Sequence, residues 1–276
     1  RIFRGVRFEQ RYGFRMESQT EILARRAVEM EMVGRLTNAR VRDELIDICS
    51  ERHPLPLKCL RRLEELGALR ALHPSLAVSE EVEERFLRLE ESWEELKRLL
   101  GDEKRGWVLS MAALLSSLPA EEAEKWCRQM RFRRDDRDAL LQCLRLVPGL
   151  LRELDEEELA PSRATRLLDP LKRESLTYLY ALGGRRVRER VASYLERWSH
   201  VRPQVTGKDL EAIGLEPSPL FSRILGRLRD AVLDGVARGR EEELKLVAEY
   251  LQEMGLEEAG DLAGSGGFPG SGDDSR

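Results

Sequence analysis

The sequence is short of the residues from which many active sites and metal sites are built. Its 276 residues include only three histidines and four cysteines. The cysteines, Cys49, Cys59, Cys127 and Cys143, are widely spaced among leucines and form no CxxC pair, so we predict buried, reduced thiols and no zinc site. GxSxG, Walker, HD and HxxxH motifs are also absent, which argues against serine-hydrolase, P-loop and metal phosphohydrolase chemistry.

Long apolar runs and aromatic side chains are scarce as well. No apolar segment reaches the roughly 18 residues that a bilayer span requires, and no signal peptide opens the chain. We therefore expect a cytoplasmic protein without a membrane partner. Runs of β-branched residues are almost absent, whereas Leu, Ala, Glu and Arg, all good helix formers, dominate. The composition predicts an all-α fold.

Charge is abundant but unevenly distributed. Residues 1–62 contain 14 Lys and Arg against 9 Asp and Glu, whereas the remaining chain contains 33 against 42. A basic first part on an acidic protein indicates a local site for a polyanion. On charge alone, the alternative that solvated helix faces simply differ in sign remains open.

Apolar residues at helical spacing predict many short helices. In residues 39–49, Val41, Leu45 and Ile48 form an i, i+4, i+7 stripe that marks one face as buried. Other helices are expected near residues 1–12, 17–32, 57–66, 80–100, 105–118, 120–130, 134–146, 156–168, 171–183, 187–202 and 241–253. Breaks are expected at proline and glycine, as at the Pro148–Gly149 step. Residues 259–276 are rich in Gly and Ser, which predicts a disordered end.

The first helix carries four arginines on one face. At about 100° per residue they fall within a stripe of roughly 120°. They are Arg1, Arg4, Arg7 and Arg11. Guanidinium groups in such a row repel one another, so the arrangement favours facing phosphates or carboxylates, which arginine binds with two parallel donors. The alternative is a surface face that neighbouring glutamates neutralise.

The segment RIFRGVRFEQRYGFRME resembles the pattern EDxxRxxRAxRFxxxxGF, which follows the catalytic head of class II tRNA nucleotidyltransferases and bacterial poly(A) polymerases. The matching positions are Arg1, Arg4, Arg7, Phe8, Gly13 and Phe14. Gly5 stands where the family usually has Ala, a change expected to cost about 0.5–1 kcal/mol of helix stability. In that family EDxxR contacts the Watson–Crick edge of incoming CTP or ATP. The resemblance therefore implies nucleotide binding by Arg1 and Arg4, and RNA binding by Arg7 and Arg11.

Two further segments resemble the same family. NARVRDELIDIC is similar to ERIRDELxKIL and implies Arg40 and Arg42 as RNA-binding residues, although we favour a bracing role for Arg42 through Asp43 or Glu44. VTGKDLEAIGLEPSPLFSRILGRLRDAVLDG resembles the family's tail segment TGxDLxxxGxxPGPxxGxxL, where a glycine-rich turn exposes backbone N–H groups that suit phosphate. This implies Gly207 and Lys208 as RNA-binding residues. Serines replace two of the expected glycines, which leaves a ligand-free helix joint as the alternative.

The resemblance implies an elongated all-α protein with a neck (residues 1–75), a helical body (76–202) and a tail (203–258). It implies the C-terminal RNA-binding part of an enzyme that adds CMP and/or AMP to tRNA 3′ ends, with the acceptor–TΨC arm of tRNA as partner. CTP and ATP would be substrates. We expect the catalytic head, which binds Mg²⁺, to be missing from this chain and supplied by the same polypeptide or a separate one, so this chain alone would be inactive with no catalytic or metal-binding residue. A non-catalytic helical scaffold that binds RNA or protein is the alternative.

Overall fold

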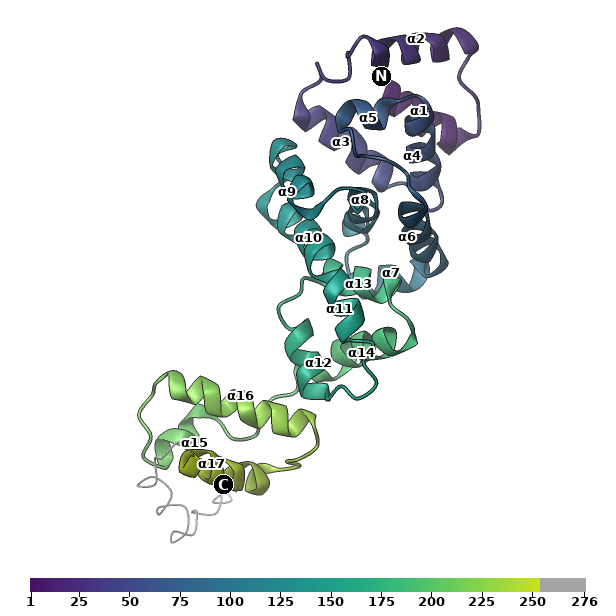
Figure 1. Cartoon of the computed structure of the whole chain (residues 1–276). Coiled ribbons are helices and arrows are strands. Elements are labelled where there is room, and N and C mark those ends of the chain that lie inside the picture. Colours follow the sequence, from purple (N-terminus) through teal and green to yellow (C-terminus); the bar gives the residue numbers. More distant parts are fainter. Residues whose placement is uncertain (254–276) are drawn as a thin grey trace, which may run out of the picture. The chain divides into compact units, whose positions relative to one another are not determined.

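The computed structural model describes residues 1–253, which form α-helices, two short 3-10 helices and no strand (Figure 1). The all-α prediction is confirmed. The α-helices are α1 (Ile2–Tyr12), α2 (Ser18–Glu29), α3 (Asn38–Cys49), α4 (Leu55–Glu65), α5 (Ala68–Leu72), α6 (Glu80–Glu91), α7 (Trp93–Leu100), α8 (Trp107–Leu115), α9 (Ala120–Gln129), α10 (Arg134–Arg145), α11 (Val147–Glu153), α12 (Pro161–Leu168), α13 (Arg173–Leu182), α14 (Arg185–Glu196), α15 (Gly207–Ala212), α16 (Pro219–Leu233) and α17 (Arg240–Glu253). The 3-10 helices are η1 (Glu103–Arg105) and η2 (Trp198–His200). The predicted disordered end, 259–276, lies outside the described residues.

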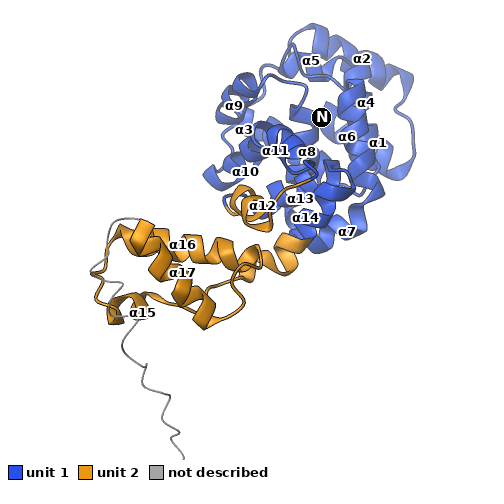
Figure 2. Ribbon diagram, turned by 60° about the horizontal axis from the view of Figure 1, so that its bottom comes forward, with its two compact units in different colours: residues 1–157, 170–192 blue, residues 158–169, 193–276 orange. Residues whose placement is uncertain are grey.

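The chain divides into two compact units (Figure 2). The first unit comprises residues 1–157 and 170–192, and the second comprises residues 158–169 and the chain from residue 193 onward. All of the predicted neck and most of the predicted body fall in the first unit, and the predicted tail falls in the second. The finer division into neck, body and tail remains a prediction.

The first unit is built around two nearly enclosed helices. All nine residues of α8 are buried, and in α13 every residue from Glu174 to Leu182 is buried. A helix that is apolar on all sides, as WVLSMAALL is, requires neighbours all round. Helices α3, α6, α10 and α13 provide them for α8. Helix α3 also packs against α1, so the core around α8 holds in place the helix on which α1 lies.

Three predicted helix boundaries are wrong, each for a local reason. The expected helix 80–100 is two helices, α6 and α7, which change direction at Ser92. Pro148 lies in the first turn of α11, which begins at Val147, instead of breaking the chain, because proline is tolerated there, where its missing N–H has no helical partner. Residues 156–160 are not helical because Pro161 disfavours helical backbone before it, and Ala160 is extended with ψ 143°.

The second unit has its own core beneath α15, α16 and α17. Its buried residues are Val205, Leu210, Ile213, Ile224, Leu228, Val247 and Leu251. Helix α12 is joined to the end of α16, because the backbone N–H and the hydroxyl of Ser162 donate to Asp234 at 2.8 and 2.7 Å.

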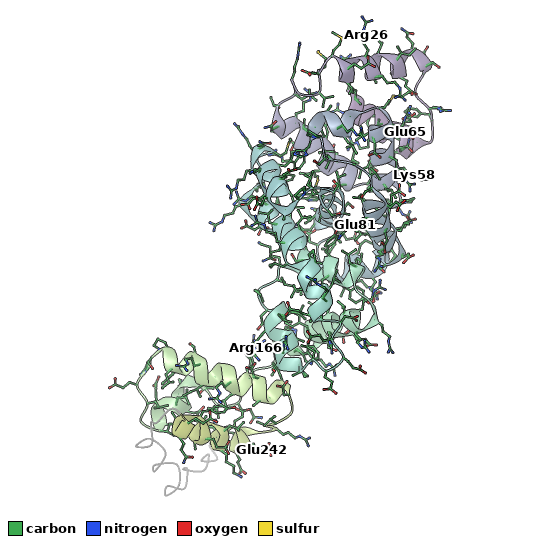
Figure 3. All side chains as sticks on the ribbon, viewed as in Figure 1. Arg26, Lys58, Glu65, Glu81, Arg166 and Glu242 are labelled. Atoms are coloured by element: carbon green, nitrogen blue, oxygen red, sulfur yellow. The ribbon has the colours of Figure 1, made fainter. Side chains whose placement is uncertain are left out.

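Charged side chains cover the outside of both units. Figure 3 labels exposed examples, among them Arg26 on α2, Lys58 on α4 and Glu242 on α17. Within residues 1–253 no helix has both the length and the apolar character needed to cross a membrane.

Candidate functional site

Helix α1 has a buried face and an arginine face. Phe3 and Val6 are buried, and Gly13 ends the helix in the left-handed region with φ 69°. The opposite face presents the four arginines of the predicted stripe, Arg1, Arg4, Arg7 and Arg11. The local periodicity of the sequence therefore places the stripe correctly on one side of the helix.

Two carboxylates of α3, and a third just after its end, face this stripe. The pairs are Arg4 with Glu44 at 3.3 Å, Arg7 with Asp47 at 2.6 Å, and Arg11 with Glu51 at 3.4 Å. Each carboxylate lies 40 residues after its arginine, so the two helices run in the same direction. Sequence reasoning missed this set of pairs. The signal was present, because the acidic residues repeat the 3, 4 spacing of the arginines.

The pairs differ in how much of each arginine they cover. The Arg7 side chain is only 15% exposed, whereas those of Arg4 and Arg11 are 57% and 50% exposed. Arg7 therefore serves chiefly to join α1 to α3. Arg4 and Arg11 keep enough free surface to contact a ligand, and ion pairs of this exposed kind contribute only about 0–1 kcal/mol each. Their predicted nucleotide and RNA contacts remain predictions.

Two of the predicted arginines have no carboxylate partner. Arg1, at the start of α1, and Arg40, in the first turn of α3, are exposed and form no ion pair within residues 1–253. A guanidinium in this state keeps all its donors for a ligand. Arg1 is the position that the family resemblance assigns to the nucleotide base.

Arg42 braces the first unit. Its guanidinium donates to Asp43 at 2.7 and 2.9 Å and to the backbone carbonyl of Arg131 at 2.6 Å. Nearby, the amide of Asn38 donates to the carbonyl of Gln129 at 2.9 Å, so the start of α3 is fastened to the end of α9. The expected pairing of Arg42 with Asp43 is confirmed, and its contact with RNA remains a prediction.

A buried ionic cluster lies beneath the far end of α1. Arg62 of α4 pairs with Glu9 at 3.1 Å, with Glu21 at 2.5 Å and with Glu65 at 2.9 Å. The side chains of Arg62 and Glu9 are only 10% and 3% exposed. The hydrogen bond from Arg62, followed by that from Arg25, lowers the pKa of Glu21 to about 2. The cluster joins α1, α2 and α4, and the guanidinium of Arg62 is fully engaged by carboxylates.

The predicted tail site forms a capped turn in the second unit. Thr206 and Asp209 make a reciprocal capping box at the start of α15, and Asp209 also pairs with Arg240 at 2.5 Å. These bonds hold the pKa of Asp209 well below its usual range, the hydrogen bond from Arg240 being the main cause. Lys208 is exposed and forms no ion pair within the described chain. A Cβ at Gly207 would meet Phe221 at an ordinary 3.5 Å, so the fold does not require glycine there.

Within residues 1–253 no group of three or more His, Cys, Asp or Glu side chains is placed to hold a metal ion. The four cysteines are free and buried, as predicted, and burial raises the pKa of the Cys59 thiol to about 12. We assign no catalytic step to these residues.

Sequence comparison identifies two relatives. The chain is 31% identical over 255 residues to an A-adding tRNA nucleotidyltransferase of Geobacter sulfurreducens, a match that covers 89% of this chain and 28% of that protein. It is 24% identical over 260 residues to the A-adding tRNA nucleotidyltransferase of Halalkalibacterium halodurans, covering 91% of this chain and 56% of the relative. No protein-family model matches the chain.

Comparison with solved structures also finds CCA-adding enzymes. The Thermotoga maritima CCA-adding enzyme in complex with tRNA matches 91% of this chain and 60% of its own with a TM-score of 0.73 and 25% identity. A CCA-adding enzyme in complex with CTP matches with a TM-score of 0.74, and one in complex with ATP with 0.73. The chain thus spans less than two thirds of these proteins. Its homologues and structural neighbours are tRNA nucleotidyltransferases of the CCA-adding or A-adding kind.

Proposed function

We propose that this chain is the RNA-binding part of a tRNA nucleotidyltransferase that adds CMP and/or AMP to tRNA 3′ ends. The observation that carries the proposal is the likeness, over nine-tenths of the chain, to a CCA-adding enzyme whose structure contains tRNA. The partner would be the acceptor–TΨC arm of a tRNA, in the cytoplasm. Double-stranded RNA is recognised mainly by shape and phosphate contacts, which suits a surface of exposed arginine and lysine side chains.

The ion pairs within the first unit suggest which predicted residues contact the ligand and which position the others. Arg1, which lacks an ion-pair partner, would contact the base of the incoming nucleotide, and Arg4 would lie beside it. Arg7 and Arg42 would position these groups through their bonds to Asp47 and Asp43.

The exposed cations farther away would contact the RNA backbone. They are Arg11 and Arg40 in the first unit and Lys208, beside Gly207, in the second.

Catalysis would come from a nucleotidyltransferase domain in the same polypeptide or in a separate chain. That domain would bind Mg²⁺, for which residues 1–253 offer no suitable set of ligands. CTP and ATP would be the substrates, as complexes of related CCA-adding enzymes with these nucleotides suggest. Poly(A) synthesis, the activity of the related polymerases, remains open. Assays with CTP alone, ATP alone and both would distinguish the CCA-adding, A-adding and poly(A)-adding activities.

Binding of a tRNA acceptor minihelix across a salt series tests the proposal. We expect affinity to fall steeply with salt, because each phosphate contact releases counterions. The double variant Arg11→Gln and Arg40→Gln should lower the slope of log affinity against log salt by about 1–2, since each lost phosphate contact lowers it by about one. Arg134→Gln is the control, because that side chain is 89% exposed and belongs to no predicted site.

Weak binding that does not respond to salt would overturn the proposal and favour a protein-binding scaffold. The enzymatic part is tested separately. The chain is mixed with a nucleotidyltransferase domain from a relative, and CMP and AMP addition to the minihelix is measured. Failure with every such domain would leave RNA binding without the enzymatic role.

A further inference from the structure

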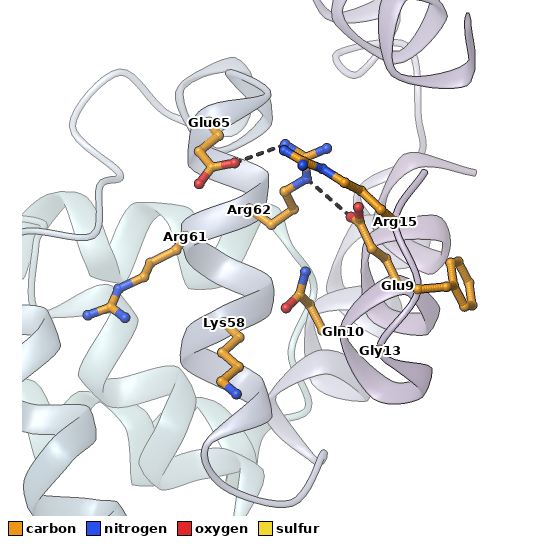
Figure 4. Close-up of a pocket in the computed structure, with 9 residues that line it drawn as sticks. Glu9, Gln10, Gly13, Arg15, Lys58, Arg61, Arg62 and Glu65 are labelled. Atoms are coloured by element: carbon orange, nitrogen blue, oxygen red, sulfur yellow. Dashed lines mark hydrogen bonds and ion pairs between the residues drawn. The ribbon is translucent and has the colours of Figure 1, made fainter. Parts of the chain in front are cut away.

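A pocket of about 480 Å³ lies between the end of α1 and the outer face of α4 (Figure 4). The turn after α1 contributes Phe14 and Arg15, the last part of α1 contributes Glu9 and Gln10, and α4 contributes Lys58 among others. The volume is large enough for a nucleotide-sized ligand. None of the predicted site residues lines it, and at 1.5 Å per residue its nearest lining residue on α1, Glu9, lies about 12 Å along the helix from Arg1.

Two cations of this pocket are free. At the base of the pocket the guanidinium of Arg62 is already bonded to Glu9 and Glu65, so it is not free for a ligand (Figure 4). By contrast, Lys58 and Arg15 are exposed and form no ion pair within the described residues.

The two free cations are also well separated. Figure 4 shows Lys58 and Arg15 toward opposite ends of the space between α1 and α4, whereas Arg61 points away, toward its partner Glu83 at 2.6 Å. The pocket therefore offers two positive groups to a ligand that carries two separate negative charges.

An exposed aromatic stack stands at the edge of the pocket. The rings of Tyr12 and Phe14 lie nearly parallel, with centroids 6.4 Å apart and an interplanar angle of 10°. Phe8 supports Tyr12 from the helix at 5.9 Å. The left-handed backbone of Gly13, with φ 69°, turns the chain between the two rings. Tyr12 and Phe14 are nevertheless 66% and 52% exposed, so much of each ring is open to a ligand.

We propose that this pocket binds one unpaired nucleotide of an RNA, with its base stacked on Phe14 and its two flanking phosphates at Lys58 and Arg15. Aromatic platforms combined with cations are the usual means of holding single-stranded nucleic acid, because every base has a π-face. A base-paired nucleotide cannot bind in this way, since neighbouring bases cover both its faces. The inference rests on the proposed function and adds to it a second contact, remote from Arg1, that recognises a single-stranded segment.

The test compares two minihelices, one with three unpaired 3′ nucleotides and one blunt. Affinities of the full chain are measured by fluorescence anisotropy. We expect Phe14→Leu and Lys58→Gln to weaken binding of the overhang RNA by at least about fivefold, the lower end of a base–aromatic stack, and to leave the blunt RNA unchanged. The controls are Leu87→Ala, whose side chain is 49% exposed on α6, and Lys125→Gln, an exposed lysine on α9. Circular dichroism confirms that each variant is folded.

A 2-aminopurine base in the overhang reports stacking directly. Its fluorescence should be quenched on binding to the wild type and not on binding to Phe14→Leu. The subsite is overturned if the variants lose affinity equally for both RNAs. It is also overturned if they lose no affinity and binding to Phe14→Leu still quenches the 2-aminopurine. If neither minihelix binds the wild type, the proposed function fails, and a single-stranded hexanucleotide then decides the subsite. Its binding must depend on Phe14 to support the inference, and absent or Phe14-independent binding overturns it.

Discussion

Replacement of Arg62 by Met should be among the most destabilising single changes in the first unit. Arg62 and Glu9 are both buried, and the guanidinium is the only cation bonded to Glu9 among the described residues. Without it, Glu9 would keep a single hydrogen bond, from the backbone N–H of Met16 at 3.0 Å. The variant would therefore leave the carboxylate of Glu9, which is 3% exposed, without a charged partner.

The magnitude follows from that burial. Removing one partner of a buried ion pair typically costs about 3–5 kcal/mol, because the remaining charge is desolvated without compensation. The other two partners of Arg62 contribute less, since Glu21 and Glu65 are 23% and 60% exposed and can be hydrated. Replacing both charged groups, as in Glu9→Gln with Arg62→Met, should therefore recover much of the loss.

Urea unfolding followed by tryptophan fluorescence measures the effect, because Trp93, Trp107 and Trp126 all lie in the first unit. The neighbouring Arg61 supplies the control. Its pair with Glu83 is exposed, with side chains 47% and 35% accessible, so Arg61→Met should cost no more than about 1 kcal/mol.

Two results would refute the reasoning. One is a loss of less than about 1 kcal/mol in Arg62→Met, equal to that of the control at Arg61. The other is a double variant with Glu9→Gln whose loss equals the sum of the single losses. Either would mean that Glu9 is effectively hydrated and that the cluster does not hold α1 against α4.

Two further predictions concern the same unit. The hydrogen bond from Arg62 lowers the pKa of Glu21 from 4.5 to about 2, so the stability that ionised Glu21 contributes is complete above pH 4.5 and is lost as the pH falls toward 2. When the free energy of unfolding is measured against pH, it should decline less steeply on acidification in Glu21→Gln than in the wild type. Identical profiles would disprove this linkage. In Gly183→Ala the new Cβ would lie 2.5 Å from Val187, an overlap that should cost about 1–3 kcal/mol of stability. Gly184→Ala is the control, because a Cβ there meets nothing within 4 Å. Equal thermal stability of the two variants would show that the turn relaxes freely.

Helix placement depended mostly on local information. The stripe of Val41, Leu45 and Ile48 predicted a buried face, and all three residues are buried in α3. Reasoning from proline failed where position within the helix decides its effect, as at Pro148, which lies in the first turn of α11. The junction at Ser92 was missed because two helices in sequence can share one continuous apolar period while changing direction.

The sequence alone determined that Arg1, Arg4, Arg7 and Arg11 share one helix face, because the period of an α-helix is a property of the backbone. It also carried the resemblance to tRNA nucleotidyltransferases, which the homologues bear out. Only the tertiary structure decided which of these charges remain available. Packing of α3 beside α1 gives three of the arginines carboxylate partners and leaves Arg1 free, and packing of α4 forms the pocket at Phe14. Charge neutralisation depends on which helices meet, and no local pattern specifies that.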